Sequence, residues 1–70
     1  MFEITRCYQG KSANGKDYVQ VSYFDVDTGE AGNCIMSPAY LAKITEGIAN
    51  GKTLRQGYDR EKRKNFLYVK

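Results

Sequence analysis

Residues 17–25 have the sequence DYVQVSYFD, in which β-branched and aromatic residues predominate. Such residues favour an extended chain, whose successive side chains point to opposite sides. Val19, Val21 and Tyr23 then share one side of the chain. The other side carries a mixture of aromatic and polar residues, namely Tyr18, Gln20, Ser22 and Phe24. We therefore predict a strand at residues 17–25.

Similar patterns predict further strands on both sides of this one. Phe2, Ile4 and Tyr8 alternate with other residues, so we expect them to share one face of a strand at residues 2–8. Additional strands are expected at residues 30–36, 52–58 and 66–69. A charged loop at residues 59–65 separates the last two.

A helix is predicted between the third and fourth strands. Ser37 is a good N-cap, and Pro38 at the first helical position loses nothing by lacking an N–H group. Apolar residues then recur at helical spacing, at Leu41, Ile44 and Ile48. Gly51 favours a helix end, because glycine accepts the left-handed conformation. We therefore expect a helix from Pro38 to Ala49.

The predicted order is three strands, one helix and two strands, in a single domain of residues 1–70. This is the order of the OB-fold, a small five-stranded barrel that often binds oligonucleotides. We therefore expect a mostly β domain with one helix, arranged as a small OB-like barrel. A chain of this size buries only about 60% of its unfolded surface, so its core is small.

The stretch from Gly10 to Tyr18, GKSANGKDY, is close to the start of a phosphate-binding loop. Such a loop needs a Ser or Thr after its lysine and a helix behind it. Here Asp17 follows Lys16, and the next residues alternate like a strand, so we reject a nucleotide-hydrolysing site. Asn14-Gly15 instead predicts a hairpin turn, because both residues tolerate positive φ. This turn places lysines on an exposed tip.

The remaining candidate sites are weak. Asp25 and Asp27 match the start of a calcium loop, but the residues that follow favour a plain turn. Cys7 and Cys34 have no Cys or His neighbour at metal-ligand spacing, so we expect reduced thiols and no metal or other cofactor. The chain has no His, and its serines have no base, so we expect no catalytic site. With no membrane-length apolar run or signal peptide, we expect a cytoplasmic protein.

Positive charge is concentrated in the second part of the chain. Residues 1–42 contain three basic and five acidic residues, whereas residues 43–70 contain eight basic and three acidic ones. The charged loop at 59–65 holds four cations between aromatic residues on both sides. Cations attract a phosphate backbone, and nearby aromatic rings allow the bases of an unpaired strand to stack. The pattern predicts binding to single-stranded nucleic acid.

Two groups of residues are candidates for this binding. Phosphates would be neutralised by Lys11, Lys16, Arg55, Arg60, Lys62 and Arg63. Bases would stack on Tyr18, Tyr58 and Tyr68, with additional contacts from Arg6 and Tyr23. The expected function is binding that tolerates any sequence, with DNA as the expected ligand. No chemical reaction on the ligand is expected. The alternative is a small phage or plasmid protein that modulates a host protein, because exposed strand edges and tyrosines also serve protein interfaces.

Residues 10–26 also resemble a segment of the single-stranded DNA-binding proteins of filamentous phages. The shared features are a serine, a small or polar pair, a glycine, a polar or basic residue, one further residue, and a tyrosine that begins a strand. The resemblance implies an OB-fold protein that forms dimers and coats DNA cooperatively during replication. It implies that Lys16 and Tyr18 contact DNA.

Overall fold

Three strands, one helix and two further strands follow one another along residues 1–70 of the computed structural model. They are β1 (Phe2–Lys11), β2 (Asp17–Asp25), β3 (Ala31–Met36), α1 (Pro38–Ala49), β4 (Leu54–Asp59) and β5 (Lys64–Val69). The predicted order and the bounds of the helix are confirmed. β1 and β5 are longer than the strands predicted at residues 2–8 and 66–69.

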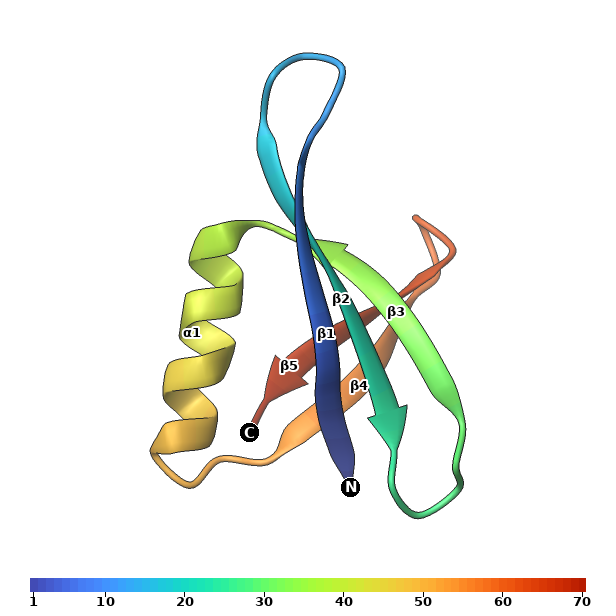
Figure 1. The fold of residues 1–70 in the computed structure, drawn as a ribbon. Coiled ribbons are helices and arrows are strands. Elements are labelled where there is room, and N and C mark those ends of the chain that lie inside the picture. The colour runs from blue at the N-terminus through green and yellow to red at the C-terminus, as the bar shows by residue number, and fades with distance from the viewer.

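The strands form two antiparallel sheets, one with the order β1-β2-β3 and one that is the β4-β5 hairpin. Figure 1 shows the three-stranded sheet crossing in front of the hairpin, with α1 beside both. β3 lies near β5 and β1 lies near β4, but no hydrogen-bonded ladder joins the two sheets. The expected five-stranded barrel is therefore not closed, because side-chain packing alone connects the sheets along these two seams.

The core lies between the two sheets and the helix. β2 contributes Val19, Val21 and Tyr23, which confirms the predicted apolar face of this strand. The other buried apolar residues are Cys34, Met36, Ile44, Leu54 and Leu67. Each large side chain that is fully buried stabilises the fold by about 1.5–3 kcal/mol. Four side chains meet this description, namely Val19, Val21, Ile44 and Leu67. The eight core residues come from β2, β3, α1, β4 and β5, and β1 adds only the partly buried Phe2 and Ile4.

A β-bulge at Thr5 changes the side chains that β1 presents to each face. Ile4 pairs with Tyr23 but Arg6 pairs with Ser22, so Thr5 is an extra residue without its own partner. Its hydroxyl donates a hydrogen bond to the Ser22 carbonyl at 3.2 Å. An extra residue reverses the alternation of the strand beyond it.

This reversal corrects the prediction for Tyr8. Phe2 and Ile4 pack against the core, as expected, but Tyr8 pairs with Gln20 and lies on the opposite, outer face. Its side chain is 51% exposed. Regular alternation through residues 2–8 was therefore a wrong assumption, because the bulge depends on how β1 meets β2.

The helix begins and ends as its sequence predicts. The Ser37 hydroxyl accepts a hydrogen bond from the Tyr40 N–H at 3.1 Å, and Pro38 follows the cap directly. Gly51 adopts a left-handed φ of 88° just beyond the helix, where a side chain would be strained. Ile44 is buried in the core. No helix of the structure is both long and apolar enough to cross a membrane.

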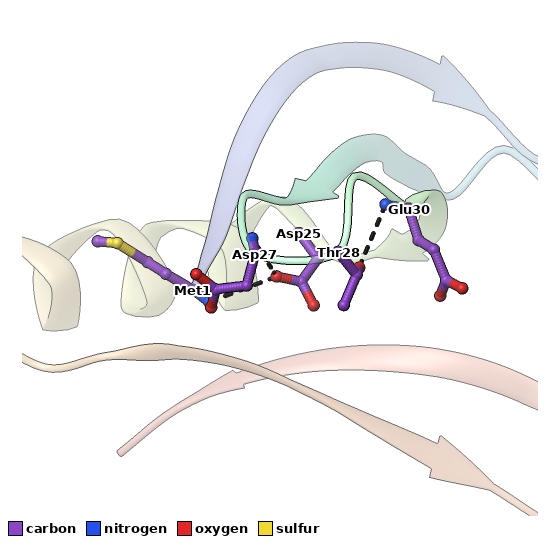
Figure 2. Close-up of polar contacts among 5 residues, drawn as sticks. All are labelled: Met1, Asp25, Asp27, Thr28 and Glu30. Carbon is purple, nitrogen blue, oxygen red and sulfur yellow. Dashed lines mark hydrogen bonds and ion pairs between the residues drawn. The ribbon is translucent and has the colours of Figure 1, made fainter.

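The turn between β2 and β3 is fixed by its own side chains and by the N-terminus (Figure 2). Asp25 accepts a hydrogen bond from the Asp27 N–H at 3.0 Å, and Thr28 accepts one from the Glu30 N–H at 3.3 Å. The Met1 ammonium group lies 3.4 Å from Asp25 and contacts Asp27 more closely. The predicted turn is confirmed.

Candidate nucleic-acid interface

The outer face of the three-stranded sheet carries two rows of side chains that run across the strands. Tyr8 is paired with Gln20, which is paired with Ile35 on β3. Tyr8 is 51% exposed and Ile35 is 56% exposed. The neighbouring row consists of Arg6, Ser22 and Asn33. These two rows therefore offer two exposed apolar side chains among polar groups that carry no negative charge. The next row of the face consists of Glu3, Phe24 and Ala31, and Glu3 is acidic.

Arg6 and Tyr8 form a joined pair on this face. The guanidinium Nη1 donates a hydrogen bond to the Tyr8 hydroxyl at 2.8 Å, and the guanidinium carbon lies 6.0 Å from the ring centroid. A cation at this distance interacts favourably with the aromatic ring. The pair brings a positive charge next to an exposed ring.

A groove of about 260 Å³ continues from Ile35 toward β5. It lies between β3, β5 and the start of α1, and we call it the β3–β5 groove. Its walls include the exposed rings of Tyr40 and Phe66 and the side chains of Lys62 and Lys64. Aromatic rings and lysines therefore meet here from the helix, the last strand and the loop before it.

Cys34 lies at the buried side of the same groove. Burial raises the pKa of its thiol, and the Leu67 backbone and the Lys64 charge offset this effect only in part. The thiol is therefore protonated at neutral pH. It acts as a small apolar part of the groove and not as a nucleophile.

Two aromatic rings on the outer face are held against glycines of the neighbouring strand. Phe66 pairs with Gly57, and a Cβ atom at position 57 would lie 2.4 Å from the Phe66 Cζ. Tyr18 pairs with Gly10 in the same way, with a corresponding distance of 2.6 Å. Because glycine has no side chain, each ring lies directly on the backbone. This contact restrains the rings before any ligand is bound.

The β1–β2 loop is the predicted hairpin turn. Gly15 has a φ of 80°, and the Ser12 N–H donates to the Lys16 carbonyl at 2.9 Å. The loop leads into β2 and not into a helix, so the context of a phosphate-binding loop is absent. Lys11 lies 3.6 Å from Asp17, which partly offsets its charge. Lys16 has no acidic partner and is the stronger of the two phosphate candidates.

The β4–β5 loop carries unpaired positive charge. Asp59 fixes this turn by accepting hydrogen bonds from the N–H groups of Glu61 and Lys62, at 3.0 and 3.2 Å. Arg63 adopts a left-handed φ of 53°. The exposed cations are Arg60, Lys62 and Arg63 in the loop and Lys64 at the start of β5. None of them forms an ion pair with a carboxylate, so their charge is available to a phosphate.

Tyr68 and Tyr58, which were both predicted to stack on bases, lie on opposite sides of the β4–β5 hairpin. Tyr68 is half-buried on the outer face next to Phe66, with ring centroids 5.8 Å apart, and it pairs with Arg55 on β4. Tyr58 is 58% exposed but lies one position from Gly57, so it faces the other side of the hairpin from Phe66. It does not join the groove.

Tyr23 is buried in the core at 2% exposure, so its ring is not accessible to a base. Burial raises the pKa of its hydroxyl, against a small opposite effect of the Asn65 side chain. The hydroxyl makes no hydrogen bond of acceptable geometry. The additional stacking contact predicted for Tyr23 is therefore wrong.

Sequence reasoning missed several residues of this interface, namely Tyr8, Ile35, Tyr40, Lys64 and Phe66 as binding candidates. Phe66 and Lys64 were signalled by the charged loop between aromatics. The other three had no usable signal, because their positions depend on a bulge and on contacts between distant elements.

Searches of protein-family models, curated proteins and solved structures found no match to this chain. The interpretation of the interface therefore depends on its geometry. An exposed strip of Tyr8, Gln20, Ile35 and Phe66, which we call the outer strip, crosses β1, β2, β3 and β5. The two basic loops extend beyond the body of the molecule at the top and upper right of Figure 1.

Proposed function

We propose that this protein binds single-stranded nucleic acid, in the first place DNA, along the outer strip. The observation that carries the proposal is the exposure of Ile35 and Phe66 beside the unpaired Lys62 and Lys64. The exposed Tyr8 extends this surface onto β1, where Arg6 lies beside its ring. The rings would stack on bases while Lys16, Lys62 and Lys64 neutralise phosphates. We also infer that the two sheets are an open form of an OB-like barrel, since β3 lies near β5 and β1 lies near β4.

An unpaired strand suits this surface better than a duplex does. Stacking requires a free base face, and each stacked base contributes about 1–3 kcal/mol. Reading a duplex would require a helix or a strand pair that enters a groove. The only helix carries Lys43 and Glu46 as its charged residues, so it has no basic face for this purpose.

The charges favour one orientation on a polyanion. The turn between β2 and β3 lies at the end of the molecule that holds the N-terminus, away from the β1–β2 loop (Figure 1). This turn carries the acidic residues Asp25, Asp27 and Glu30. The basic loops would therefore face the phosphates while the acidic turn points away. Binding by charge neutralisation weakens as salt rises. For a single strand, the logarithm of the binding constant falls by about 0.7 per neutralised phosphate for each tenfold increase in salt concentration.

A titration with a labelled oligonucleotide at two salt concentrations tests the proposal. We expect binding that weakens strongly with salt and a single strand that competes better than the same sequence as duplex. Tyrosine fluorescence provides an independent signal, since the chain has six Tyr and no Trp. Absence of binding, or affinity that does not change with salt, would overturn the proposal.

A protein-interaction function is the second candidate. An apolar groove of about 540 Å³ lies between β1 and α1, with Phe2, Ile4, Leu41 and Ile48 among its lining residues. This groove is separate from the outer strip. If binding to a protein were the function, oligonucleotides would leave the tyrosine fluorescence unchanged and a partner would bind in a fixed stoichiometry.

A further inference from the structure

Tyr40 lies between two grooves. It lines the β3–β5 groove with Phe66, and it also lines a groove of about 410 Å³ along α1. We call the latter the helix groove. The Tyr40 hydroxyl donates a hydrogen bond to the Leu67 carbonyl at 2.9 Å. This bond ties the ring to β5 at the residue between Phe66 and Tyr68, so the two grooves adjoin at Tyr40.

The aromatic surface continues through this point. Phe66 and Tyr68 are two residues apart on one strand, so they share a face. Their ring centroids are 5.8 Å apart and their planes differ by 38°. Phe66 lines the first groove and Tyr68 lines the second. The two rings therefore form a continuous aromatic surface from one groove to the other.

The helix groove has the charge expected of a phosphate-binding surface. Lys43 and Lys52 line it together with a single acidic residue, Glu46. Arg55 lies beside it, because it pairs with Tyr68 across the β4–β5 ladder. None of these four side chains forms an ion pair. Three exposed cations therefore face one carboxylate around an aromatic ring.

We propose that a single strand bound to the outer strip continues past Tyr40 into the helix groove. There Tyr68 contacts a base, and Lys43 and Lys52 neutralise phosphates. This inference rests on the proposed function and adds a requirement to it: the preferred ligand is long enough to occupy both grooves. A short strand would occupy the outer strip alone.

The test compares a short and a long oligonucleotide of thymidine, of about 5 and about 15 nucleotides, which are within the range of site sizes of one OB-fold domain. The double variant Lys43→Gln, Lys52→Gln removes two charges from exposed positions. We expect threefold to tenfold weaker binding of the long strand, with its logarithmic salt slope lower by about 1.4. Binding of the short strand should be unchanged.

The double variant Lys43→Arg, Lys52→Arg keeps both charges and is the matched control, which should bind the long strand as the natural protein does. Circular dichroism checks that both variants are folded. If the Gln variant loses the same affinity for both strands, or for neither, the strand does not continue into the helix groove. The proposed function would remain intact. If the natural protein binds neither strand, the proposed function fails, and this inference fails with it.

Discussion

Phe66 lies across Gly57 so closely that a Cβ atom at position 57 would come within 2.4 Å of its ring. The absence of a side chain at position 57 therefore determines where the ring sits. Backbone conformation does not require glycine here, because Gly57 is not among the residues with positive φ. The consequence of replacing it should be seen in binding more than in folding.

Gly57→Ala should displace the Phe66 ring and weaken the binding of a single-stranded oligonucleotide about threefold to tenfold. The expected loss is a fraction of the ~1–3 kcal/mol that one stacked base contributes, because the ring is moved and not removed. Fluorescence titration measures the effect. Phe66→Leu should weaken binding at least as much, and adding Gly57→Ala to it should have no further effect. Additive losses would show that Gly57 does not act through the ring.

Tyr8 and Tyr58 are similarly exposed, at 51% and 58%, but lie on different surfaces. Tyr8→Ala should weaken oligonucleotide binding about tenfold, which corresponds to the ~1–3 kcal/mol expected for a lost stacking contact. Tyr58→Ala should change it less than twofold, because this ring faces away from the groove. Equal losses in the two variants would contradict the assignment of the outer strip.

The turn around Asp25 should make stability depend on pH below about 4. The Asp27 N–H and the N-terminal ammonium hold the pKa of Asp25 below its ordinary value of 3.8. A carboxyl whose pKa is lower in the folded chain stabilises the fold above its unfolded pKa, and the benefit is lost as the pH falls through the folded pKa. In the variant Asp25→Asn, the melting temperature should therefore fall less as the pH is lowered below about 4.

The matched control for this change is Asp17→Asn, which removes an exposed carboxylate at the other end of β2. The N-terminal amine makes stability depend on pH on the alkaline side, because the hydrogen bond to Asp27 raises the pKa of this amine above 8.0. That contribution is complete below the unfolded pKa and is lost as the pH rises through the folded one. A melting temperature that is flat in acid for the natural protein would contradict the role of Asp25.

The two thiols should differ in reactivity. Cys7 is exposed, whereas Cys34 is 7% exposed and burial raises the pKa of its thiol. Because thiolates are the reactive form, an alkylating reagent should modify one cysteine of the native protein. Mass spectrometry should locate it at Cys7, and Cys34 should react only after denaturation. Fast modification of Cys34 in the native protein would contradict its position in the core.

Local sequence signals predicted the elements that depend on local chemistry. The helix from Pro38 to Ala49 was predictable because its cap and the glycine beyond its end act within a few residues of each terminus. The apolar face of β2 was predictable because the extra residue of the β1–β2 pairing lies in β1, so β2 itself keeps regular alternation. The β1–β2 turn followed from Asn14-Gly15 alone.

The interface was less predictable, because it depends on contacts between distant residues. The bulge at Thr5 forms only against Ser22, so the exposure of Tyr8 could not be read from β1 alone. Tyr23 and Tyr58 have the same residue type as Tyr18, but only the packing of the sheets decides which ring is buried and which faces the groove. Ile35 and Phe66 line the same groove between β3 and β5, two strands that are not paired by hydrogen bonds.

The placement of the acidic turn opposite the basic loops gives the molecule an electric dipole. A long polyanion exerts a torque on such a dipole before the two molecules are in contact. Protein molecules that bind along one strand would therefore have the same orientation relative to it. Salt should therefore slow the association of the protein with its ligand more than it hastens release.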